Sequence, residues 1–215
     1  MKVSQLPPEA LRDFCSACST GLAGLTDNEA CIRLVSGMLP RLIADKALFR
    51  NILEGMVADA PYPDLRYATM FDSEVILYRD PDRRFSLRLF FWEPGGYDPV
   101  HDHNAWGVVG PVSGELEIVN YIRIDDGQRE GQALLKETGR RTIRPGESYH
   151  VRGPESIHKT GNPGSRMTLQ VSVYGRPQSG RDHVNGFDVA NRRMYPIYAP
   201  KTVKQRLAAR SLSDF

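Results

Sequence analysis

The sequence predicts a mainly β protein with a helical N-terminal section, and two observations support that class. Over residues 1–60, apolar side chains recur at helical spacing between proline and glycine signals. From Tyr67 onward, the segments become short and alternate between apolar and polar residues, with glycine and proline turns between them. Many short strands of this kind are typical of a sandwich or a barrel. We therefore expect one domain, in which a helical section (residues 1–60) packs on a β-barrel with a C-terminal tail (residues 61–215).

The helical section divides into three segments. The first, PPEALRDFCSACSTGLAGL, starts at two prolines and ends near two glycines. The second, TDNEACIRLVSGMLPRLIAD, opens with Thr26-x-x-Glu29, a capping-box pattern, and contains Pro40, which should kink or split it. The third, KALFRNILEGMVA, predicts a short helix. All three cysteines lie in the first two segments, and we expect them to be reduced and packed in or on helices.

The remaining chain predicts strands in sequence. EVILYR, the turn DPDR and RFSLRLFFW form a hairpin. Further strands are expected in HDHNAWGVVG, GELEIVNYIRI, QALLKE, RTIRPGESYHV and MTLQVSVYG. Gly139, Pro145 and Gly146 mark a second hairpin turn. After Tyr195, the segment KTVKQRLAARSL predicts a short surface helix.

Composition argues against several classes of partner. The formal net charge of +2 gives no strong attraction to nucleic acid or to a membrane surface. No apolar run approaches the length of a membrane span, and the first residues lack the apolar core of a signal peptide. We expect a cytoplasmic protein, monomeric or homodimeric, with no nucleic-acid or membrane partner.

Two of the five histidines, His101 and His103, are separated by a single residue. On an extended strand, they point the same way and Asp102 points the opposite way. Two imidazoles on one face can hold a metal ion if a third ligand comes from elsewhere. His158 is the preferred third ligand, with His150 as the alternative, while His183 is expected in a surface loop. By residue chemistry alone, iron and zinc are equally suitable.

The spacing around these histidines resembles the cupin superfamily. Its motifs match Gly95-x5-His101-x-His103, a later glycine, a Pro-Gly turn and His158-x-x-x-Asn162. This resemblance implies a cupin double-stranded β-helix, or jelly-roll barrel. Within the superfamily, residues 67–175 look like the cysteine dioxygenase (thiol dioxygenase) family, bacterial type. The closer resemblance rests on HDH, on Trp92 and the Trp106-Gly107 pair, and on His158, Asn162 and Tyr174.

The family resemblance implies an Fe(II) site formed by His101, His103 and His158, with Tyr174 as the catalytic tyrosine. Many cupins have a glutamate ligand at the position of Gly107, so this chain keeps three histidines only. The family's Ser-x-His-x-Tyr relay corresponds to Gln170, Ser172 and Tyr174, and no cysteine lies in the barrel segment to cross-link the tyrosine.

The substrate-binding residues follow from strand alternation. Arg88, Phe90 and Trp92 share one face, and the resemblance places Trp92 inside the barrel. An interior arginine suits a carboxylate, because its planar fork donates two parallel hydrogen bonds. We expect Arg88, Trp92, Gln170 and Ser172 to contact the substrate. Arg166 and Arg181 are rivals for the anion, and an arginine at the barrel mouth paired with a glutamate is the alternative for Arg88.

The sequence therefore predicts a non-haem Fe(II)-dependent thiol dioxygenase, which oxidises a small thiol (3-mercaptopropionate- or cysteine-like) with O2 to its sulfinic acid. Two alternatives stay open. One is a different metal-dependent cupin enzyme, either a diketone-type dioxygenase or a zinc or manganese enzyme. The other is a non-catalytic cupin sensor.

Overall fold

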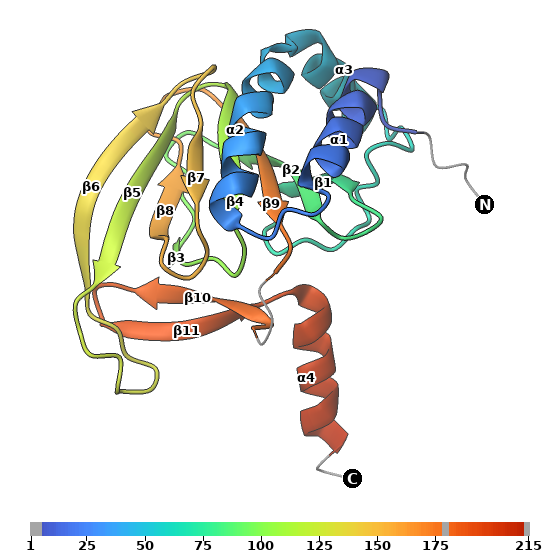
Figure 1. The fold of residues 1–215 in the computed structure, drawn as a ribbon. Helices are drawn as coiled ribbons and strands as arrows, with labels where there is room; N and C mark the ends of the chain where they lie inside the picture. Colours follow the sequence, from blue (N-terminus) through green and yellow to red (C-terminus); the bar gives the residue numbers. More distant parts are fainter. Residues whose placement is uncertain (1–5, 178–180, 213–215) are drawn as a thin grey trace.

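The computed structural model describes residues 6–177 and 181–212, and its body is a pair of facing antiparallel sheets (Figure 1). One sheet has five strands in the order β1-β2-β9-β4-β7, and the other has six in the order β11-β10-β3-β8-β5-β6. The strands are β1 Glu74–Arg79, β2 Phe85–Trp92, β3 Val100–His101, β4 Gly107–Ser113, β5 Leu116–Arg123, β6 Leu135–Ile143, β7 Tyr149–Val151, β8 Ile157–Gly161, β9 Thr168–Gly175, β10 His183–Asp188 and β11 Arg193–Tyr198.

Three N-terminal helices cover the outer face of the five-stranded sheet: α1 Glu9–Leu22, α2 Asn28–Ala44 and α3 Lys46–Val57. Two expectations for α2 are wrong. Its N-cap is Asp27, whose carboxylate accepts from the Ala30 N–H at 2.9 Å, and not Thr26. The helix also runs through Pro40 without being split.

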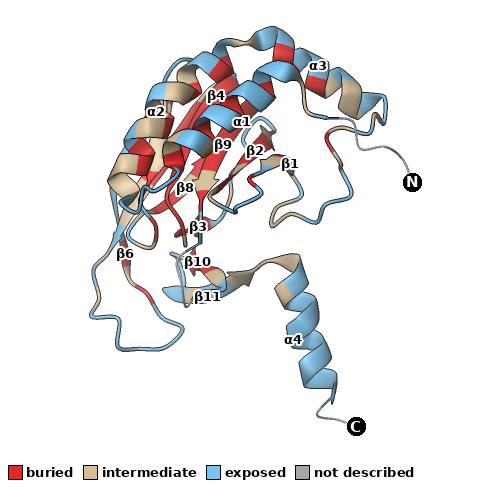
Figure 2. Ribbon diagram, turned by 45° about the vertical axis from the view of Figure 1, so that its right-hand side comes forward, coloured by how far each residue is buried: buried red, intermediate tan, exposed pale blue. Residues whose placement is uncertain are grey.

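Each face of the five-stranded sheet contributes to a different core. Leu87, Leu89 and Val171 are fully buried against the helices. Phe90, Trp92 and Val109 point the other way and pack between the sheets. Figure 2 shows the matching pattern in the helices, whose inner faces are buried and outer faces exposed. The predicted fold class, a mainly β protein with a helical N-terminal section, is confirmed.

Several strand predictions need correction. Gly139 is no turn: it pairs with Asn120 inside β6, which joins the two segments predicted on either side of it. A register shift after Asn120 absorbs the irregularity. The strand β8 and the hairpin β10–β11 were not predicted. The hairpin extends the six-stranded sheet, so His183 lies on a strand and not in a surface loop.

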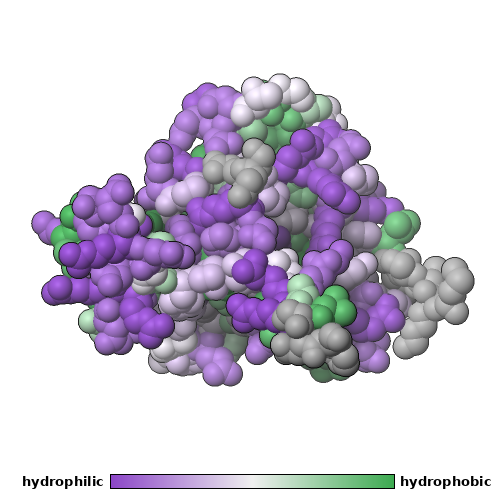
Figure 3. Space-filling view, turned by 90° about the horizontal axis from the view of Figure 1, so that it is seen from below, coloured by the Kyte–Doolittle hydropathy of each residue, from purple (hydrophilic) through white to green (hydrophobic). Residues whose placement is uncertain are grey.

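The remaining features are at the surface or in the helices. All three cysteines are free and buried, as predicted, and burial raises the pKa of Cys18 to about 12. The C-terminal helix α4 (Pro200–Leu212) is exposed along its length and projects from the body (Figures 1 and 2). Seen from below, the molecule is mostly hydrophilic with small separate hydrophobic patches (Figure 3). Within the described residues, no helix is long and apolar enough to cross a membrane.

Candidate metal centre

Three buried histidines meet at one point between the sheets. His101 on β3 pairs directly with His158 on β8, and His103 follows β3 by two residues. The ring centroids are 4.8, 4.9 and 5.0 Å apart, and one ring nitrogen from each residue lies within 4.8 Å of the others. The predicted ligand set is therefore brought together in a cluster that could hold a metal ion.

The chemistry of the cluster fits a metal cation. The Nε2 atoms of His103 and His158 lie 3.0 Å apart, roughly the separation of two imidazole ligands on one ion. Burial, with repulsion from His101, holds the pKa of each of these two rings well below its usual range. Both imidazoles are therefore neutral near pH 7, as metal ligation requires. Nδ1 of His158 is buried without a hydrogen-bond partner in the described part of the chain.

His101 is oriented from behind. Its Nδ1 lies 2.9 Å from the Pro99 carbonyl oxygen, so this nitrogen carries the proton and Nε2 keeps its lone pair. The Asp98 carboxylate lies 3.5 Å from the same Nδ1, and burial raises the pKa of Asp98 to about 6. On the other side, the Phe71 ring lies 6.2 Å from the His101 ring. This is the second layer of contacts typical of a histidine ligand.

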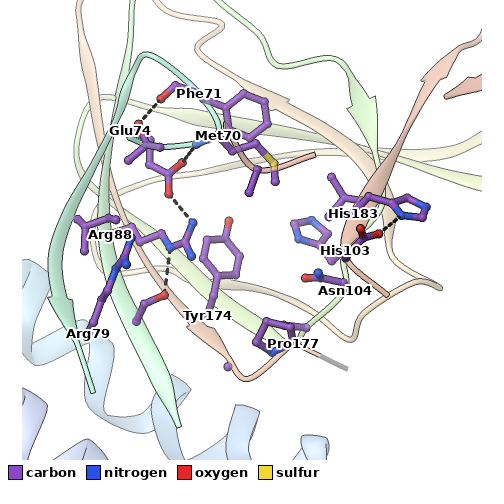
Figure 4. Close-up of a pocket in the computed structure, with 18 of the residues that line it drawn as sticks. Met70, Phe71, Glu74, Arg79, Arg88, His103, Asn104, Tyr174, Pro177 and His183 are labelled. Atoms are coloured by element: carbon purple, nitrogen blue, oxygen red, sulfur yellow. Dashed lines mark hydrogen bonds and ion pairs between the residues drawn. The ribbon is translucent and has the colours of Figure 1, made fainter. Parts of the chain in front are cut away.

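A pocket of about 540 Å³ opens onto the cluster. His101 and His103 line its inner end, and Arg88 and Tyr174 lie together across from His103 (Figure 4). Phe71, Met70 and Phe90 supply apolar wall, while the start of α4 contributes to the mouth. The pocket is much larger than the side chain of any single amino acid, so a small molecule has room beside the histidines.

Arg88 faces the pocket, as predicted, but it is already paired. Its Nη1 donates to the Glu74 carboxylate and its Nε donates to Ser86 Oγ at 3.0 Å. The guanidinium carbon lies 5.4 Å from the centre of the Tyr174 ring. The pairing with a glutamate that the sequence left open as an alternative is therefore present, together with the predicted inward position.

Tyr174 lies parallel to His103, with ring centroids 5.9 Å apart. Burial raises its pKa to about 12, so the hydroxyl stays protonated at neutral pH and can donate a hydrogen bond. Its cross-strand partner is Gly107, where a Cβ atom would lie 2.5 Å from the tyrosine ring. The absent side chain at residue 107, where many cupins have a glutamate, makes room for this ring.

The other predicted substrate residues lie behind the pocket wall. Trp92 Nε1 donates to Gln170 Oε1 at 2.9 Å, and Gln170 Nε2 donates to Ser172 Oγ at 2.7 Å. All three residues are buried, and none is among the residues that line the pocket. Their substrate contact stays a prediction, and what they form in this structure is a chain of hydrogen bonds.

The rival residues have other places. His150 pairs with Val108, whose side chain faces the helices, so His150 is on the face away from the cluster. Arg166 is exposed and does not line the pocket. Arg181 does line it, but is paired with Asp102. His183, expected at the surface, is half-buried and lines the pocket mouth.

Asn162 of the histidine motif has a structural role. It is fully buried, and its Nδ2 donates to the carbonyl oxygens of Trp92 at 3.0 Å and Arg166 at 2.6 Å. Its Oδ1 accepts from the Gly164 N–H at 2.9 Å. The asparagine therefore fixes the turn after β8 and does not contact the cluster.

Three residues of the site were missed from the sequence. Tyr149 stacks on His158 at 5.6 Å and donates to Asn120 Oδ1 at 2.6 Å. Strand alternation could have found it, because it is the neighbour of His150 on the opposite face. Glu74 and Phe71 precede or begin the first strand, where no spacing signal distinguishes them.

No family model matches the sequence. Solved structures similar to this chain include a cupin 2 domain-containing protein from Halorhodospira halophila, at 18% identity over 59% of this chain and 76% of that chain, with a TM-score of 0.40. A sugar phosphate isomerase from a cupin superfamily, from Silicibacter pomeroyi, has 19% identity over 59% and 77%, with a TM-score of 0.37. The Cupin_2 domain of an XRE family transcriptional regulator from Enterobacter cloacae has 22% identity over 49% and 99%, with a TM-score of 0.34. Likenesses this distant say nothing about the reaction.

Proposed function

We propose that this chain is a non-haem Fe(II)-dependent thiol dioxygenase of the cysteine dioxygenase type. It converts a small thiol and O2 into a sulfinic acid, RSH + O2 → RSO2H, with both oxygen atoms added to sulfur. Because the four electrons that reduce O2 come from the sulfur, no further reductant is required.

The observation that supports this proposal is the composition of the pocket's inner end. Three imidazoles without a carboxylate ligand lie on one side, and a guanidinium and a tyrosine hydroxyl lie on the other. Fe(II) bound by the histidines supplies the redox chemistry, with open positions for a thiolate and O2. Neutral ligands leave the ion its full positive charge, which favours an anionic sulfur.

The chain's own residues then orient the substrate. Arg88 keeps N–H groups free of Glu74 and Ser86, and these can donate to the far end of a 3-mercaptopropionate- or cysteine-like thiol. Tyr174 donates its hydroxyl proton into the same space. Phe71, Met70 and Phe90 limit the access of water to the reacting atoms.

The test is to load the protein anaerobically with Fe(II) and follow O2 uptake with 3-mercaptopropionate, L-cysteine, cysteamine and acetylacetone. Uptake with a thiol, matched by one sulfinate per O2, is the expected result. Uptake with acetylacetone alone supports the diketone-type alternative, and strict zinc occupancy supports a zinc enzyme.

His101→Ala should abolish both metal retention and thiol-dependent O2 uptake, because it removes one of three ligands. His150→Ala is the matched control, since it removes a histidine on the opposite face of the sheet. Metal content and turnover are measured together. Full iron retention in His101→Ala contradicts the assignment of the site.

A further inference from the structure

Both arginines deep in the pocket are paired with buried carboxylates. The side chain of Glu74 is 1% exposed and that of its partner Arg88 is 32% exposed. The side chain of Asp102 is 4% exposed and that of its partner Arg181 is 18% exposed. The pocket therefore presents guanidinium N–H groups whose positive charges are cancelled from behind.

Glu74 is held firmly in this role. One carboxylate oxygen accepts from Arg88, and the other accepts from the Met70 N–H at 3.1 Å. Its backbone pairs with Phe90, so its side chain is on the same inner face as Arg88 (Figure 4). A buried carboxylate is costly unless it is paired in this way, and an uncharged acceptor could have bonded to Arg88 without that cost.

Other charged groups at the pocket are farther out or compensated. Arg79 and Arg83 are exposed at the rim, where solvent screens them. Asp80 is buried but pairs with Arg84, and Asp182 lies beside His183. Among the described residues, the Glu74–Arg88 pair is thus the charge arrangement that the far end of a metal-bound thiol meets.

We propose that Glu74 is a specificity-determining residue, which cancels the charge of Arg88 so that the pocket takes a thiol whose far end has no net charge. A zwitterionic amino-acid end or an amide satisfies this condition, whereas the lone carboxylate of 3-mercaptopropionate does not. The inference rests on the proposed function, because it assumes that the thiol sulfur is at the metal. It selects among the substrates proposed above.

The experiment uses two ligands of the same shape and different charge, 3-mercaptopropionate and 3-mercaptopropionamide. The full-length protein is loaded with Co(II) and titrated anaerobically, and the thiolate-to-cobalt absorption band gives Kd for each ligand. The ratio of the two Kd values isolates the effect of charge at the far end. No turnover is needed.

The wild-type protein should bind the amide at least as tightly as the carboxylate. Glu74→Gln should shift the ratio about tenfold toward the carboxylate, because a negative charge within several ångströms is removed from a poorly solvated site. Glu115→Gln is the matched control, since it removes a glutamate paired with Arg144 at the surface, and its ratio should be unchanged. A merely structural role for Glu74 weakens both ligands equally and leaves the ratio unmoved.

Arg88→Gln should shift the ratio in the opposite direction, and the double variant Glu74→Gln/Arg88→Gln should return it to the wild-type value. The wild-type ratio alone is decisive if a variant does not fold: tighter binding of the carboxylate by tenfold or more overturns the inference. A cobalt band with an unchanged ratio in Glu74→Gln overturns it as well. If no thiol gives a band, the proposed function fails, and this inference fails with it.

Discussion

At the scale of single residues, Gly107 and Tyr174 share one space on the inner face of the five-stranded sheet. They are cross-strand partners, and a Cβ atom at residue 107 would lie 2.5 and 2.7 Å from two carbon atoms of the tyrosine ring. The third close neighbour, Val151, is at 3.0 Å. A ring held between two backbones cannot move aside without changing its position relative to His103.

We therefore expect Gly107→Ala to displace Tyr174, to lower the free energy of unfolding by about 1–3 kcal/mol, and to lower turnover by about 10²-fold. Denaturant titration and O2 uptake measure the two effects. Gly139→Ala is the control, because a Cβ atom there has nothing within 4 Å. Wild-type turnover in Gly107→Ala would show that the position of the tyrosine ring is unimportant.

The sequence was informative about residues whose position depends on local periodicity. Alternation correctly gave the inward face of Arg88 and the outward direction of Asp102, and motif spacing correctly gave His158 as the third member of the cluster. Pairing across strands was not accessible in this way. Nothing in the sequence specifies that Glu74 lies beside Arg88, because their contact depends on the register of two strands.

At the scale of elements, the two-residue strand β3 is too short to fix His103 by its own hydrogen bonds. Asp102 does this instead. Its carboxylate accepts from the backbone N–H and the side-chain amide of Asn185, both at 2.8 Å, and from Arg181. Arg181 also lies 3.4 Å from the carbonyl oxygen of His103. The hairpin β10–β11 is thus the support of the histidine segment.

Asp102→Ala should therefore weaken metal affinity by about 10–100-fold, as loss of an outer-shell partner typically does. Competition with a chelator for Zn²⁺ measures it. Asp188→Ala, at the far end of β10, removes an exposed carboxylate that bonds only to Asn191 and should leave the affinity unchanged. Equal affinities in the two variants would mean that the hairpin does not position the ligands.

The elements that the sequence missed are those without a local signal. In β10 the residues are half polar and include Gly186, and β11 contains Pro196, so neither alternates cleanly. The hairpin forms because β10 pairs with β3 and continues an existing sheet. Gly139 was placed in a turn for the converse reason, since its tolerance within β6 comes from the register shift in β5.

At the scale of the whole molecule, the helices and the barrel share one core. Leu39 and Val35 of α2 and Leu89 of β2 are fully buried in the same cluster, which lies on the side of the sheet opposite to the pocket. The two tryptophans sample both sides. Trp106 belongs to the core under the helices, and Trp92 belongs to the core between the sheets. The single-domain expectation therefore has a direct physical test.

Leu39→Ala in α2 should lower the free energy of unfolding by about 2–5 kcal/mol, because it leaves a cavity in this shared core. The experiment uses a Trp106→Phe background, in which Trp92 alone reports on the barrel interior. Helix circular dichroism and Trp92 fluorescence should lose stability together, in one coincident transition. Leu207→Ala is the control, since that leucine is 56% exposed on α4 and its truncation should change neither signal. If the helix signal shifts while the Trp92 transition stays in place, the helices unfold separately. The sheet that carries Arg88 and Tyr174 then does not depend on them.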